Sequence, residues 1–133
     1  MNIAISKCTR YLIRMAQQFH PTLEQIQLGS VLAALGDDTR LAMVAHIRRS
    51  ETGTAVCGSF LHLASKSNLT YHLSKLREAG VVRVVPQGTR KFVSLRTDDL
   101  ETRFPGLLDS ILGGLPAGFG AEVAREFEAS AAA

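Results

Sequence analysis

The chain has 133 residues, of which 46% are hydrophobic and 20% charged, and these proportions indicate a single globular domain rather than a disordered protein. Its apolar runs are far shorter than the ~18 residues needed to cross a bilayer, and its N-terminus has no signal-peptide pattern. Two cysteines, Cys8 and Cys57, are too few for a disulfide scaffold. We therefore expect a cytoplasmic protein without membrane association.

Positive charge is concentrated in one part of the chain. The net charge is +3, but residues 61–96 contain seven lysines and arginines and a single acid, Glu78, which gives +6 for this stretch and −3 for the remainder. A local excess of this kind is the footprint expected for a polyanionic partner such as DNA. The alternative is a solvated basic face, and the predicted elements decide between the two.

Helical spacing of apolar residues predicts three helices in the first part of the chain, over residues 5–19, 23–35 and 38–49. Asp37 and Asp38 form a pair of neighbouring carboxylates. Because both follow a glycine at a helix start, the pattern favours helix capping over catalysis.

A short helix and a longer, capped helix follow. Residues 51–58 are expected to form a loop and residues 60–64 a short helix. Ser65 is a good cap for the next helix, which Gly80 should end. The apolar stripe of that helix consists of Leu69, Leu73 and Leu76.

The apolar period then changes from helix to strand. Residues 81–85 and 92–95 predict two strands joined by a turn at residues 86–89, with a basic tip. Asp98 and Glu101 then fit a capping box, which is typical of a helix start.

The order of these elements predicts a mainly α-helical winged helix-turn-helix with a small β-hairpin wing. In this plan a helix enters the major groove, where base edges display a unique pattern of donors and acceptors, and the wing contacts the backbone or the minor groove. We assign residues 1–112, which include a last apolar helix stripe at 107–112, to the DNA-binding and dimerisation domain. Residues 113–133 form a linker and a C-terminal tail that is either weakly helical or frayed.

The face opposite the leucine stripe carries short hydrogen-bonding groups and cations. Side chains in the first turns should reach base edges, and the expected base contacts are Lys66, Asn68, Thr70 and Tyr71. The expected phosphate contacts are Ser67, Ser74, Lys75 and Arg77. On the wing, the candidates for contact with the groove or the DNA backbone are Arg90 and Lys91.

His72 lies beside the apolar stripe, which favours a packed, hydrogen-bonded histidine over a ligand or a base reader.

Residues 65–82 resemble the recognition helix of ArsR/SmtB-type repressors, chiefly through His72-Leu73, the Leu-Arg-Glu-Ala-Gly run at 76–80 and the valines that follow. Residues 33–41 and the Gly-Thr-Arg hairpin tip are also similar to that family. The resemblance covers roughly residues 23–112. It implies a homodimer built from the first and last helices that binds a palindromic operator near its own promoter, with repression relieved by an inducer.

The family's two well-known metal sites are incomplete here. One uses a Cys-x-Cys pair before the short helix, where this chain has only Cys57, and the other uses histidine and carboxylates on the final helix, where it has Asp109 without a histidine. A single thiolate is a weak soft-metal site. We therefore expect neither a metal site nor a cofactor.

The cysteines provide a second candidate for a sensor. Cys57 precedes a short helix, whose N-terminal dipole can lower the pKa of a thiol and so favour oxidation. Cys8 could form a disulfide or a metal site with Cys57 if the N-terminal helix packs across the dimer. A buried core role for Cys8 and a passive role for Cys57 are the alternatives.

These observations together predict a sequence-specific regulator of transcription that binds double-stranded DNA, a repressor released by an inducer or by thiol oxidation. The alternative is a winged-helix protein-interaction module without specific DNA binding. An enzyme is disfavoured because the sequence has no paired carboxylates outside helix caps, no nucleophile–base arrangement and no phosphate-binding loop.

Overall fold

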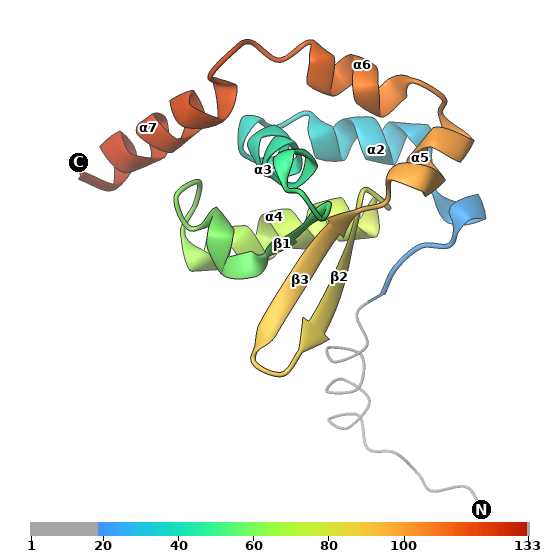
Figure 1. The fold of residues 1–133 in the computed structure, drawn as a ribbon, viewed down its shortest axis with the longest axis horizontal. Coiled ribbons are helices and arrows are strands. Elements are labelled where there is room, and N and C mark those ends of the chain that lie inside the picture. Colours follow the sequence, from blue (N-terminus) through green and yellow to red (C-terminus); the bar gives the residue numbers. More distant parts are fainter. Residues whose placement is uncertain (1–18, 133) are drawn as a thin grey trace, which may run out of the picture.

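The computed structural model describes residues 19–132 of the chain (Figure 1). Its α-helices are α2 (Leu28–Leu35), α3 (Asp38–Arg49), α4 (Lys66–Glu78), α5 (Thr97–Arg103), α6 (Leu107–Gly113) and α7 (Phe119–Ala132). Its strands are β1 (Thr54–Val56), β2 (Val82–Gln87) and β3 (Arg90–Leu95). Two 3₁₀ turns are η1 (Leu23–Gln25) and η2 (Cys57–Phe60).

The three strands form one antiparallel sheet in the order β1-β3-β2. Val93 lies at the centre of the sheet, because it pairs with Val84 of β2 on one side and with Ala55 of β1 on the other. All three of these side chains are buried. The β2–β3 hairpin extends away from the helices in Figure 1 and leaves its tip in solvent.

Helix α3 lies at the centre of the core. Its Met43, Val44 and Ile47 are fully buried, together with Phe60 and with Leu76 of α4. In Figure 1, α2 and α3 lie between α6 above them and α4 below them. A single continuous cluster of hydrophobic side chains thus fixes α4 against α2 and α3.

Several predicted elements are confirmed. Helix α3 begins at its expected cap, where the Asp37 carboxylate accepts the backbone N–H of Arg40 at 3.0 Å. Helix α4 begins after Ser65, whose hydroxyl accepts the N–H of Asn68 at 3.4 Å. The hairpin is also present. For the C-terminal tail, which the sequence left open as weakly helical or frayed, the structure shows a helix, with Val123 of α7 buried against α3.

The predicted helix over residues 23–35 is wrong in its first part, which is a 3₁₀ turn followed by extended backbone at Ile26 and Gln27. The reason is tertiary. Ile26 is buried, and its carbonyl accepts a hydrogen bond from the Arg103 guanidinium at 2.7 Å, so this contact with the distant α5 satisfies the extended backbone in place of a helical bond.

The segment between α3 and α4 also differs from the prediction. The expected loop at residues 51–58 contains strand β1. Of the expected short helix at 60–64, Phe60 is the last residue of η2 and the remaining residues form a turn and bend. Strand β1 has only three residues and exists because it pairs with β3, almost forty positions further along the chain. Its local sequence carries no signal for that pairing.

Two smaller predictions are also corrected. The turn of the hairpin is confined to Gly88 and Thr89, because Pro86 belongs to β2, an edge strand where proline is tolerated. The capping box predicted at the start of α5 is wrong: Glu101 instead accepts the N–H of Gly106 beyond the end of that helix, at 3.1–3.2 Å.

The predicted helix over residues 5–19 lies almost entirely outside the described residues.

Candidate nucleic-acid interface

Helix α4 is held in a fixed orientation by its inner face and by its C-terminal end. Leu69, Leu73 and Leu76 are buried on its inner face, as their spacing predicts. At its C-terminal end Gly80 takes a positive φ of 86°, and the following N–H, of Val81, returns to the carbonyl of Leu76 at 2.9 Å. The outer face is therefore presented to solvent in one orientation.

That outer face carries the residues expected to contact DNA. Those of the first turns are all exposed, namely Lys66, Ser67, Asn68, Thr70 and Tyr71. Tyr71 is 54% exposed, which is a large exposed area for an aromatic ring, and Lys75 places its Nζ 5.5 Å from the ring centroid. The Thr70 hydroxyl donates its hydrogen to the Lys66 carbonyl at 3.2 Å. With this bond made, the hydroxyl oxygen can still accept a hydrogen bond from a partner.

The phosphate-contact candidates nearer the C-terminal end of α4 are less exposed. Ser74 and Arg77 are half-buried, and the Arg77 guanidinium donates to the carbonyl of Phe19. Arg77 thus has a structural contact that the sequence did not suggest. Lys75 remains exposed, as expected for a side chain that would contact phosphate.

The structure brings the wing next to α4. Arg90 and Lys91 are exposed beside the Gly88-Thr89 turn. Lys91 also lines a cavity of about 40 Å³ together with Thr70 and Ser74 of α4, so wing and helix form one surface.

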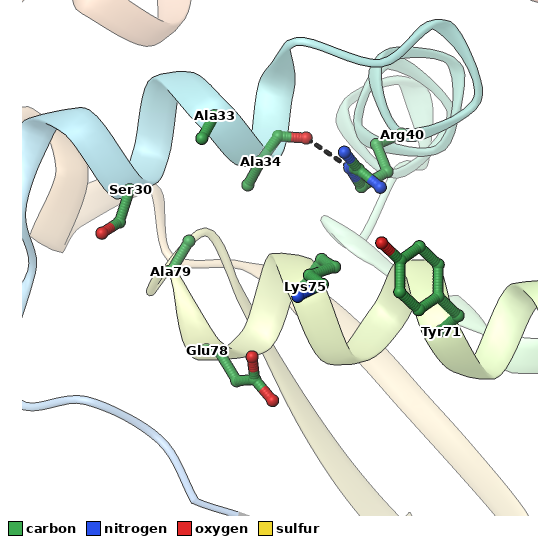
Figure 2. A pocket seen from close by; sticks show the side chains of 8 residues that line it. All are labelled: Ser30, Ala33, Ala34, Arg40, Tyr71, Lys75, Glu78 and Ala79. Carbon is green, nitrogen blue, oxygen red and sulfur yellow. Dashed lines mark hydrogen bonds between the residues drawn. The ribbon is translucent and has the colours of Figure 1, made fainter.

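A groove of about 390 Å³ runs between α2 and α4 (Figure 2). Its walls include Ser30 of α2, Tyr71 and Lys75 of α4, and Arg40 of α3. Arg40 adds a third cation-bearing element to this surface. Its position beside α4 depends on how α3 packs, and helix periodicity alone does not reveal it.

His72 joins α4 to α3. Its Nδ1 lies 3.1 Å from Nη1 of Arg40, which donates, and 4.0 Å from the Asp37 carboxylate. Burial lowers the pKa of His72; the Asp37 carboxylate acts in the opposite direction but does not outweigh burial, and Arg40 adds to the lowering. The neutral ring therefore accepts from Arg40, and the predicted packed, hydrogen-bonded histidine is confirmed.

Cys57 does not have the electrostatics expected of a reactive thiol. It is half-buried at the start of η2, and burial raises its pKa, although Lys91 acts in the opposite direction. The expected lowering by a helix dipole is wrong, because η2 is a single short turn and desolvation dominates. Cys8 lies outside the described residues, so its pairing with Cys57 stays a prediction.

Within residues 19–132, no group of three or more histidine, cysteine or acidic side chains could hold a metal ion. In the same part of the chain, no helix combines the length and the apolar character needed to cross a membrane.

The helix-rich fold, its small three-stranded antiparallel sheet and the exposed basic face of α4 beside the hairpin are consistent with a winged helix. No protein-family model matches the sequence. The chain is 31% identical, over 85 residues, to the uncharacterized HTH-type transcriptional regulator YceK of Bacillus subtilis (strain 168), a match that covers 62% of this chain and 84% of that protein. The chain therefore belongs to the HTH-type transcriptional regulators. This is a class of DNA-binding proteins rather than enzymes.

Proposed function

We propose that the protein is a sequence-specific repressor of the ArsR/SmtB type that binds a palindromic operator in double-stranded DNA as a homodimer. The observation that carries this proposal is the outer face of α4. Four side chains suited to base edges, Lys66, Asn68, Thr70 and Tyr71, are exposed on a helix whose other face is locked into the core.

Phosphate contacts would then come from the flanks of this face. Lys75 on α4 and the wing residues Arg90 and Lys91 are exposed cations on either side of the base-reading turns. Ser67 and Ser74 add short hydroxyl donors. Contacts of this kind fix the register of the helix in the groove without reading sequence.

An apolar surface that stays exposed among the described residues supports the homodimer. Leu28 and Leu32 of α2 are each 46% exposed, and an open groove of about 370 Å³ runs from Leu28 to Phe104 and Leu107. Exposed apolar area of this kind is typical of a surface that another chain covers. A two-fold dimer would read two half-sites about one helical turn apart.

Release by an inducer fits this structure better than release by thiol oxidation. The raised pKa of Cys57 leaves little thiolate at neutral pH, and the thiolate is the form that peroxide attacks. Oxidation of Cys57 therefore stays the second candidate. Equal DNA binding before and after mild peroxide, in both the wild type and Cys57→Ser, would remove it.

Selection from a random duplex library, followed by fluorescence anisotropy on the enriched sequence, tests the proposal. We expect a palindrome to be enriched. The double variant Thr70→Ala/Tyr71→Ala should lose about tenfold or more of its preference over random DNA, because each well-made base contact contributes roughly 1–3 kcal/mol of discrimination.

Thr102→Ala is the matched control, since Thr102 is an exposed threonine on α5, away from α4. It should leave the preference unchanged. An unchanged preference in the Thr70/Tyr71 variant would reject the role of α4. If the library yields no enriched sequence, the alternative of a protein-interaction module takes the place of this proposal.

A further inference from the structure

A second cavity lies away from the DNA-facing surface, between the C-terminal end of α3 and the segment that joins α6 to α7. Its volume is about 290 Å³. One side is formed by Ala45, Arg48 and Arg49 of α3, and apolar side chains of the α6–α7 segment, Leu112, Leu115 and Phe119, form much of the other. The three apolar side chains are only partly buried, so the protein itself does not fill the space between them.

The charges around this cavity do not cancel. Arg48 is paired with Asp109 of α6, and Glu122, in the first turn of α7, is paired with Arg125. Asp109 and Glu122 are thus each already engaged with another arginine. The side chain of Arg49 makes no hydrogen bond or ion pair with any residue in the described range 19–132.

The guanidinium of Arg49 is held over the start of α7. A Cβ added to Gly120 would lie 3.2 Å from its Nη2, so the contact with the helix backbone is close. A cation beside the N-terminal turn of a helix adds to the positive end of the helix dipole instead of compensating it. Both features favour an anion at this position.

We propose that this cavity binds a small amphipathic carboxylate, with its carboxylate group on Arg49 and its apolar body against Leu112, Leu115 and Phe119. Guanidinium groups pair with carboxylates through two parallel hydrogen bonds, which gives the site its preference for an anion. The volume lies at the lower end of the range for small-molecule sites and suits a body of about one aromatic ring. An inorganic anion would leave the apolar wall uncovered.

The site is connected to the DNA-facing surface through α3. His46, one turn before Arg49, places its Nε2 3.2 Å from the hydroxyl of Ser59 in η2 and stacks edge-on against Phe60. At its other end α3 contacts α4 through Arg40 and His72. A ligand that repositions the end of α3 relative to α7 would therefore alter the support of α4, an inference that rests on the proposed repressor function.

Isothermal titration calorimetry on the full chain tests the binding site with phenylacetate and isovalerate as probes. We expect at least one of them to bind with a Kd below roughly 1 mM. Phenylacetamide, which has the shape of phenylacetate but no charge, should bind about tenfold or more weaker, because a charge-assisted pair is lost. If neither carboxylate binds the wild type, or if the amide binds as well as phenylacetate, the proposal is wrong.

Two variants locate the site. Arg49→Gln should weaken binding of the carboxylate at least about tenfold, while Arg83→Gln, which removes an exposed arginine on β2, should have no effect. Gly120→Val, whose added side chain would press on Arg49, should also weaken binding, and thermal unfolding will show that both variants remain folded. Equal losses in Arg49→Gln and Arg83→Gln would place the ligand elsewhere and overturn the assignment.

Anisotropy on the selected operator then separates this inference from the proposed function. A fall in DNA affinity on addition of the bound carboxylate, absent in Arg49→Gln, supports an inducer site. Binding of the carboxylate with no change in DNA affinity overturns the inducer role and leaves the binding site standing. If no specific DNA binding is found, the proposed repressor function is wrong. The calorimetry still tests whether the cavity binds a carboxylate.

Discussion

At the scale of single residues, a few polar side chains join segments that lie far apart in the sequence. Arg96 is the most buried of them, with 7% of its surface exposed. Its Nε donates to the Asp99 carboxylate at 2.9 Å, and its Nη1 donates to the Pro21 carbonyl at 2.6 Å. The guanidinium thus ties the start of α5 to the segment that precedes η1.

Arg96→Met should destabilise the protein by about 2–3 kcal/mol, because it leaves the buried Pro21 carbonyl without a donor while conserving much of the side-chain volume. The midpoint of urea unfolding measures the effect. Arg83→Met, at an exposed position on β2, is the control and should change stability by less than about 0.5 kcal/mol. Equal midpoints for the two variants would show that Arg96 contributes no more than a surface arginine.

Stability should fall as the solution is acidified below about pH 6.5. Burial lowers the pKa of His72 and of His46 from the ordinary value of 6.5, so the folded state resists protonation more than the unfolded chain does. The stability that these neutral rings contribute is present above pH 6.5 and is lost as the pH falls through their lowered values.

Urea midpoints at pH 7.5 and pH 5.5 check this expectation. The double variant His46→Gln/His72→Gln should lose less stability between the two pH values than the wild type, because two of the groups that resist protonation are gone. An identical pH dependence in wild type and variant would assign the effect to other groups.

At the scale of elements, the position of α4 depends on the glycine that ends it. Gly80 has a φ of 86°, and an added Cβ would lie 2.6 Å from Cγ1 of the buried Ile26. Both the backbone conformation and the close packing of Ile26 therefore require glycine. This one residue sets the direction in which the chain leaves α4 for the wing.

Gly80→Ala should cost about 2 kcal/mol or more, from backbone strain and from the clash with Ile26. Gly29→Ala is the matched control: Gly29 lies in α2, and an added Cβ there would meet nothing within 4 Å. That substitution should stabilise the protein by up to about 1 kcal/mol. Thermal unfolding of both variants gives the comparison, and a loss at Gly29 as large as at Gly80 would refute the argument.

Helix α4 and the hairpin were predicted correctly because their signals are local. Ser65, the leucine spacing and Gly80 define a helix within sixteen residues, and the valine run defines β2 by itself. Only the first part of the second predicted helix is wrong, where the Ile26 carbonyl accepts a hydrogen bond from Arg103, far along the chain; its second part is α2. Strand β1 was missed for the same kind of reason, since its partner is β3.

At the scale of the whole molecule, the folded chain gathers its basic segment onto one surface. Positive residues from α4, from the wing and from the start of α3 lie around the outer face of α4. The sequence predicted the basic segment, but the contribution of Arg40 depends on the packing of α3 against α4. The assignment of individual DNA contacts stays a prediction.

Arg90→Ala should weaken binding to the operator and to random DNA by similar factors, because a wing arginine that neutralises phosphate contributes to affinity without reading sequence. The slope of log K against log salt should fall in magnitude by about 1. Arg125→Ala on α7, away from the basic surface, should leave both quantities unchanged. A selective loss on the operator alone would make Arg90 a base-reading residue.

The sequence by itself determined the capped helix α4 with its leucine stripe, the hairpin that follows it and the concentration of positive charge in both, because each depends on residues close together in the chain. The tertiary structure decided the break before α2, the presence of β1, the neutral His72 beside Arg40 and the raised pKa of Cys57. These features depend on which distant segments pack together, so the local pattern that placed His72 in a packed position did not name Arg40 as its partner or β3 as the partner of β1.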